Sequence, residues 1–121
     1  MELLLHVVDD RGLPPDGDHW SAGQYRPPSL DEEGFVHCST PEQILDVAAR
    51  FYAGRDDLHL LCLDADRLAA EVRYEALGEA TEPYPHVYGP VDRDAVVDAV
   101  PFPSDGDGFS LPERVTHLSD T

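Results

Sequence analysis

Residues 34–54 read GFVHCSTPEQILDVAARFYAG, and this stretch decides the fold. Its second half predicts a helix, because Thr40 can cap an N-terminus, Pro41 fits the first helical position and Gln43 completes a capping box. Gly54 supplies the stop. One face of this helix is apolar at helical spacing. Its members are Ile44, Val47, Ala48, Phe51 and Tyr52.

Strand patterns lie on both sides of this helix. Residues 34–38 directly before it predict a short strand, and the apolar run 3–8 predicts the first strand of the chain. Residues 58–63 are apolar on both alternating faces except for His59, which is typical of a central strand covered on both sides. Three further strands are predicted at 71–76, 86–89 and 95–100.

The stretch 71–76 alternates between charged and apolar side chains. We therefore expect its apolar residues to face the core and its charged residues to face away from it. The apolar residues are Val72, Tyr74 and Ala76. On the charged face, Arg73 and Glu75 either form an ion pair, which contributes little if it is exposed, or line a cleft.

Two other segments are less regular. Asp18 can cap a short helix that runs from His19 towards Tyr25, and Pro27-Pro28 then forces an extended connection. Prolines and glycines beyond Val100 loosen the chain, so we expect a loosely ordered tail from about residue 104.

These elements describe an α+β fold with six short strands, one main helix and one or two short helices. A doubly wound fold is disfavoured because the helices do not alternate regularly with the strands. The length of 121 residues suits a single domain that spans 1–121.

The charge of the chain excludes several classes of partner. The sequence has 25 acidic and 8 basic residues, for a net charge of -17, and every basic residue is an arginine. Such a surface repels nucleic-acid phosphates and anionic membranes, so we expect neither as a partner. The absence of lysine excludes Schiff-base chemistry and a phosphate-loop lysine. No apolar run approaches the ~18 residues of a membrane span, so we expect a cytoplasmic protein. The oligomeric state is not indicated.

The block 34–40 is the densest group, because it places an imidazole, a thiol and two hydroxyls at a helix N-terminus. His37 could orient a ribose hydroxyl or act as a general base, while Ser39 and the amides at the helix N-terminus receive a phosphate. The alternative is that Ser39 and Thr40 only cap the helix. Cys38 could be a thiolate nucleophile, but strand neighbours point to opposite faces, so Cys38 faces the core if His37 faces a cleft.

The block 85–89 is the second concentration, with His86 and Tyr88 on one side of an extended segment. The pair could sandwich an aromatic ring, or Tyr88 could fill the core of a rigid turn. Cys62 is expected to pack in the interior, and no Cys-x-x-Cys pair is present. The histidines show no metal-ligand spacing, so no metal site is expected unless tertiary contacts assemble one. The standard glycine-rich nucleotide motifs are absent.

The spacing of these blocks resembles that of the domain of unknown function 952 family, a group of small bacterial proteins. The matching residues are His6, Trp20, 34–40, Gln43, 51–54, 60–61, 73–75 and 85–90. The combination of GFVHCS at 34–39 with PHVYGP at 85–90 is specific.

The resemblance implies a fold and a site. The family is grouped by fold with the ADP-ribosyltransferases, whose split antiparallel sheets hold NAD in a cleft. His6 would match the residue that grips the ribose next to nicotinamide, and the strand 34–39 would match one that shapes the nicotinamide pocket. Transferases also present a glutamate from a late strand. The corresponding stretch 86–89 has no acid, so Glu75, or Glu113 from the tail, would replace it.

We therefore expect a chain that binds NAD or a related ADP-ribose nucleotide and that either transfers ADP-ribose to a small-molecule or protein acceptor or cleaves the nicotinamide–ribose bond. The expected catalytic residues are His37, His86 and Glu75; the expected nucleotide-binding residues are His6, Ser39, Thr40, Arg73 and Tyr88. NAD would be a substrate and not a resident cofactor. A non-catalytic binding or accessory protein is the competing hypothesis, and a metal- or thiol-dependent hydrolase that uses His37, His86 and Cys38 is a third.

Overall fold

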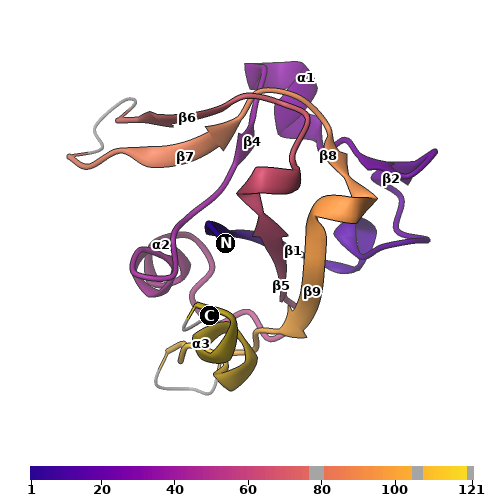
Figure 1. Ribbon diagram of the computed structural model, residues 1–121. Coiled ribbons are helices and arrows are strands. Elements are labelled where there is room, and N and C mark those ends of the chain that lie inside the picture. The colour runs from indigo at the N-terminus through magenta and orange to yellow at the C-terminus, as the bar shows by residue number, and fades with distance from the viewer. Residues whose placement is uncertain (77–80, 105–107, 120–121) are drawn as a thin grey trace.

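A three-stranded antiparallel sheet forms the centre of the computed structural model, which describes residues 1–76, 81–104 and 108–119 (Figure 1). Its strands are β1 (Leu3–Val8), β5 (His59–Asp64) and β9 (Val96–Pro101), in the order β1-β5-β9. β5 lies in the middle, as its apolar residues on both faces predict. The predicted first, central and last strands are therefore confirmed.

Two smaller antiparallel sheets pack beside the central one. The first has the order β2-β3-β8, with β2 (Trp20–Ser21), β3 (Gln24–Tyr25) and β8 (Val91–Asp92). The second has the order β4-β7-β6, with β4 (Val36–His37), β7 (Tyr84–Val87) and β6 (Val72–Glu75). A backbone bridge between Leu5 and Ser39 ties the end of β4 to β1.

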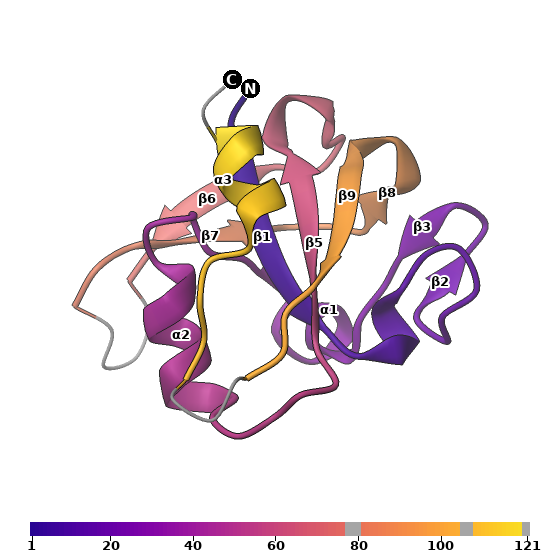
Figure 2. The same ribbon diagram turned by 90° about the horizontal axis from the view of Figure 1, so that it is seen from below.

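Two of the described helices cover one face of the central sheet, and the small sheets, with the third helix beside them, cover the other (Figure 1, Figure 2). The helices are α1 (Pro28–Glu33), α2 (Ile44–Phe51) and α3 (Glu113–Ser119), and short 3₁₀ turns occupy Asp10–Gly12, Ala65–Arg67 and Arg93–Ala95. Figure 2 shows α2 and α3 on the side of the sheet away from β2 and β3. The structure is thus an α+β fold, in which the sheets are antiparallel and α2 and α3 lie together on one face of the central sheet.

Two hydrophobic clusters fill the spaces between these layers, because successive residues of β1 and β5 point to opposite sides. One cluster joins the central sheet to the small sheets; it contains Leu4, Val8, Trp20, Tyr25, Val36, Cys38, Leu61, Leu63, Val87, Val91 and Val96. The other joins the central sheet to α2 and α3; it contains Leu3, Leu5, Ile44, Ala48, Leu58, Leu60, Cys62, Val100, Phe102 and Val115.

The segment 19–25 forms a hairpin where the sequence predicts a short helix. Trp20 pairs with Tyr25 across β2 and β3, and both rings are buried. Ala22 and Gly23 connect the strands with positive φ angles of 51° and 77°, the backbone of a tight two-residue hairpin turn. The extended connection expected at Pro27-Pro28 is present at Pro27, with φ −71° and ψ 161°, but not at Pro28. Pro28 begins α1, where its fixed φ suits the first helical position.

The predicted main helix is confirmed with a later start. The Thr40 amide donates to Gln43 Oε1 at 3.0 Å, so the glutamine half of the capping box forms, but α2 itself begins at Ile44. Phe51, at the last turn, is 72 % exposed and does not join the buried face as predicted.

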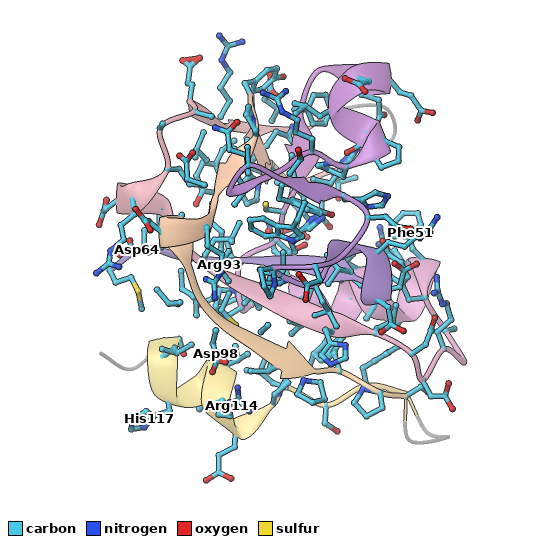
Figure 3. All side chains as sticks on the ribbon, turned by 90° about the vertical axis from the view of Figure 1, so that its right-hand side faces the viewer. Phe51, Asp64, Arg93, Asp98, Arg114 and His117 are labelled. Atoms are coloured by element: carbon cyan, nitrogen blue, oxygen red, sulfur yellow. The ribbon has the colours of Figure 1, made fainter. Side chains whose placement is uncertain are left out.

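The loose tail expected from about residue 104 instead contains a helix within its described part. Val115 of α3 is completely buried, and Phe109 stacks on Phe102 with ring centroids 4.8 Å apart. Arg114 reaches Asp98 on β9 (Figure 3). Tertiary contacts therefore order α3. Part of the predicted tail, 105–107, lies outside the described residues.

Candidate functional site

The outer face of the sheet β4-β7-β6 gathers most of the reactive side chains. His37 pairs with His86 across β4 and β7, and Arg73 pairs with His86 across β6 and β7. Directly paired residues project to the same face of an antiparallel sheet. The intervening residues Val36 and Val87 point the other way and are buried in the core. The strand alternation thus separates a chemical face from a packing face.

Phe35 forms the centre of this outer face. Gly34 ends α1 with a φ of 88°, a conformation that suits glycine, and the chain then turns into β4. The Phe35 ring stacks on His86 with centroids 4.3 Å apart and lies 5.2 Å from Tyr88 and 4.8 Å from His37. We name this group the outer-face cluster; its members are Phe35, His37, Arg73, Glu75, His86 and Tyr88.

Glu75 is the carboxylate of the outer-face cluster. Its Oε1 accepts a hydrogen bond from the Tyr88 hydroxyl at 2.5 Å and lies 3.0 Å from His86 Nδ1. These two bonds, that of Tyr88 foremost, lower the pKa of Glu75, and the same bond raises the pKa of Tyr88. The ionised Glu75 makes Nδ1 of His86 the donor, so a neutral His86 has its lone pair on Nε2. Within the described residues, neither Nε2 of His86 nor Oε2 of Glu75 has a hydrogen-bond partner.

Arg73 does not pair with Glu75, although both lie on the charged face of β6. Its guanidinium binds Glu71 at 2.7 Å and lies over the Tyr88 ring, 4.6 Å from the centroid. Tyr74, which was expected in the core, is 45 % exposed and donates its hydroxyl to Glu2 at 3.0 Å. Ala76 is exposed as well. β6 lies at the edge of its sheet, and the prediction that Tyr74 and Ala76 face the core is therefore wrong. The charged face of β6 is the one that joins the outer-face cluster.

His37 lies at the accessible border of the outer-face cluster. Its Nε2 is 2.6 Å from Glu33 Oε2 of α1, and its ring meets His86 edge-on at 5.4 Å. The His37 side chain is 52 % exposed, whereas that of His86 is 5 % exposed. An external molecule can therefore reach His37 more readily than His86.

His6 lies outside this cluster, although it touches the backbone of β4. Its Nδ1 is 2.5 Å from the His37 carbonyl oxygen and its Nε2 is 2.7 Å from the Tyr25 hydroxyl. A carbonyl only accepts, so Nδ1 donates to it, and Tyr25 donates its proton to Nε2. Burial lowers the pKa of His6 to about 4, so the ring is neutral at physiological pH. Both ring nitrogens are thus used within the protein.

Ser39 and Thr40 do not present their amides to a ligand. The Ser39 amide donates to the Leu5 carbonyl at 2.8 Å, and the Thr40 amide donates to Gln43 Oε1. Ser39 is also buried. Two of the amides near the expected phosphate position are therefore used within the protein.

The thiols and a metal centre have no support in the described residues. Cys38 is buried opposite His37, and burial raises its pKa to about 12, as it does that of Cys62. A thiolate nucleophile at Cys38 is disfavoured for that reason. In the ranges 1–76, 81–104 and 108–119, no group of three or more histidine, cysteine, aspartate or glutamate side chains could hold a metal ion.

The structure thus brings together five of the eight predicted site residues, namely His37, Arg73, Glu75, His86 and Tyr88. It adds two that were not predicted as site residues. Phe35 could have been found from its i, i+2 spacing to His37, and Glu33 from its i, i+4 spacing to His37. Glu113, the alternative carboxylate, lies on α3 in another part of the fold.

Comparison with known proteins identifies the family. The family model described as Protein of unknown function (DUF952) matches residues 15–99, most of the chain. The chain belongs to this family. That span contains the whole outer-face cluster and leaves out His6 and α3.

Two solved structures of one relative share the fold of this DUF952 protein. The crystal structure of protein CC0527 from Caulobacter crescentus is 24 % identical, with a TM-score of 0.74, and the match covers 97 % of this chain and 98 % of that one. The solution NMR structure of CC0527 is 25 % identical with a TM-score of 0.69, and it covers all of both chains. No curated protein matches the chain. None of the described helices is long and apolar enough to cross a membrane.

Proposed function

We propose that the chain binds NAD or a related ADP-ribose nucleotide at the outer-face cluster and cleaves the bond between ribose and nicotinamide. The observation that carries this proposal is Glu75. Its Oε1 is held by Tyr88 and His86, which leaves Oε2 with no hydrogen-bond partner among the described residues. The resemblance to ADP-ribosyltransferases, which the sequence blocks imply, supports the same reaction.

The cluster has the groups that this reaction needs. Cleavage breaks the bond from ribose C1′ to the nicotinamide nitrogen, and the electron pair leaves with nicotinamide. The ribose then develops an oxocarbenium charge, which an ionised Glu75 stabilises. His37 accepts the proton of the incoming water or acceptor hydroxyl through Nδ1, while Nε2 remains with Glu33. Arg73, on the same face, can contact the pyrophosphate.

The first test is titration calorimetry of NAD into the protein, with released nicotinamide measured by chromatography. The test variant is Glu75→Gln, which keeps the shape of the side chain and removes its charge. We expect it to lower the release rate by about 100-fold or more, and to leave the affinity for NAD nearly unchanged. Glu32→Gln, at an exposed glutamate of α1, is the control, and we expect it to retain full activity. No binding at about 5 mM NAD, together with no release, overturns the proposal.

A second candidate is a binding protein without turnover, and the burial of His86 favours it. The most firmly oriented imidazole of the cluster is stacked against Phe35 and is only 5 % exposed, so it is poorly placed for proton transfer to a substrate. This candidate predicts thermal stabilisation by a nucleotide, no product, and the same stabilisation in Glu75→Gln. Turnover that Glu75→Gln abolishes refutes it.

A further inference from the structure

A cavity of about 240 Å³ lies apart from the outer-face cluster. Five segments line it: the end of β1, the turn 9–12, the β2–β3 hairpin, the start of α1, and residues 52–58 after α2. The polar side chains that matter are His6, Arg11, His19, Tyr25, Tyr52 and Arg55. None of the segments that contribute Glu75, His86 or Tyr88 takes part.

Several hydrogen-bond donors in this cavity have no partner among the described residues. Arg11 binds Asp9 through Nε and one terminal nitrogen, and Arg55 binds Asp57 in the same way. A guanidinium has five N–H groups, so each arginine retains donors on its other terminal nitrogen. Among the described residues, the Tyr52 hydroxyl and the His19 ring also make no hydrogen bond.

The charge of the lining favours an anion over a cation. Two of the chain's eight arginines line this cavity, and Asp9 is the one carboxylate among the described lining residues. Asp57, the partner of Arg55, is not part of the lining. The lining residues themselves therefore carry two positive charges and one negative charge, and Asp9 lies within 4.0 Å of both arginines.

Tyr25 adds a requirement that separates one kind of anion from another. The Tyr25 hydroxyl donates its proton to Nε2 of His6. Nε2 carries the lone pair of the neutral His6 ring, because Nδ1 donates to the His37 carbonyl. The Tyr25 oxygen can therefore only accept a hydrogen bond from a ligand. An anion made only of acceptor oxygens would leave it unpaired.

We propose that this cavity binds a small oxyanion that also carries a hydroxyl group, as inorganic phosphate does at neutral pH. A phosphate monoester, whose second pKa is about 6, has mostly lost that proton. The oxyanion accepts from Arg11, Arg55 and Tyr52, and the hydroxyl donates to Tyr25. The volume corresponds to about eight water molecules and is below the roughly 300 Å³ at which pockets for larger ligands begin, so the cavity is too small for a dinucleotide. The inference does not depend on NAD binding at the outer-face cluster.

The test compares inorganic phosphate with sulfate by titration calorimetry and amide NMR at neutral pH and constant ionic strength. The two ions are tetrahedral and of similar size, but sulfate has no proton at this pH. We expect phosphate to bind, to shift the amide signals of residues 11, 19 and 52–55, and to bind about tenfold or more tightly than sulfate. Glycerol phosphate, as a monoester arm, distinguishes a site for free phosphate from one for an esterified phosphate.

Three variants locate the binding. Tyr52→Phe removes one hydroxyl without changing the packing, and Arg55→Gln removes one guanidinium; each is expected to weaken phosphate binding by about tenfold. Arg67→Gln, an exposed arginine elsewhere on the surface, is the control and should change nothing. Tyr52→Phe keeps the test valid if Arg55→Gln impairs folding.

Two results overturn the inference. The first is no phosphate binding at about 10 mM, or binding that Arg67→Gln weakens as much as Tyr52→Phe does. The second is equal affinity for phosphate and sulfate, because the committed proton of Tyr25 then has no effect.

Discussion

At the scale of single residues, His6 couples the stability of the fold to pH. Its folded pKa of about 4 lies below the ordinary value of 6.5 because the ring is buried. The unfolded chain therefore binds a proton between pH 6.5 and 4 while the folded chain does not. The contribution is fully present above pH 6.5 and is lost as the pH falls towards 4.

We expect the free energy of unfolding to fall by an amount on the order of 3 kcal/mol between pH 6.5 and pH 4 because of His6. Urea unfolding at several pH values between 6.5 and 5 measures the upper part of this window, where carboxylates such as Glu75 and Asp9 remain ionised. His6→Gln should remove that slope, whatever its absolute stability, and the exposed His117→Gln is the control. An unchanged slope in His6→Gln would contradict the assignment.

The chemistry of the outer-face cluster could be predicted residue by residue only in part. The alternation of strand residues placed His37 and Cys38 on opposite faces correctly, because that rule depends on backbone geometry alone. The bonds from His86 and Tyr88 to Glu75 depend on how β7 pairs with β6, which no local pattern specifies. His6 shows the same limit, since its partners Tyr25 and His37 lie 19 and 31 residues away in the chain.

At the scale of elements, the long periodic segments were predictable and the short ones were not. β1, β5, β9 and α2 are six to eight residues long, and each carries an apolar pattern that the local sequence reveals. β2 and β3 have two residues each, so the packing of Trp20 against Tyr25, with ring centroids 5.5 Å apart, decides them. α3 follows a stretch rich in proline and glycine, and this composition led to the prediction of a loose tail instead of a helix.

Because packing holds α3, we expect Val115→Ala to destabilise the protein by about 1–3 kcal/mol. Val115 is completely buried between α3 and the central sheet, so the substitution removes two methyl groups from a filled space. Thr116→Ala, on the exposed side of the same helix, should cost less than about 0.5 kcal/mol. Denaturant unfolding measures the free energy of unfolding of both variants. Equal losses would show that the buried face of α3 does not stabilise the protein.

At the scale of the whole molecule, the dominant property is a net charge of -17. With 25 acidic side chains against 8 arginines, the ion pairs with arginine leave most carboxylates without a counter-charge. Repulsion among these carboxylates favours the expanded, unfolded chain, and salt screens that repulsion.

We expect the melting temperature to rise by roughly 3–6 °C when sodium chloride is raised from about 0.1 M to about 1 M, which corresponds to about 1 kcal/mol for a chain of this size. Differential scanning calorimetry measures the change. The same rise in potassium chloride would show that screening, and not binding of one cation, is responsible. A melting temperature that falls with salt would mean that ion pairs such as Arg114–Asp98 outweigh the repulsion.

Among the described strands, the order β4-β7-β6 leaves one side of β6 without a neighbour. An edge strand of this kind has unpaired backbone N–H and C=O groups that can pair with a strand of another molecule. Charged side chains along the edge disfavour such pairing. The charged row Glu71, Arg73 and Glu75 therefore has two roles. It contributes to the proposed chemistry, and it disfavours edge-to-edge association between molecules. Neutral substitutions in this row affect both roles. If a variant in β6 loses activity, light scattering must first show that it has not aggregated before the loss is attributed to catalysis.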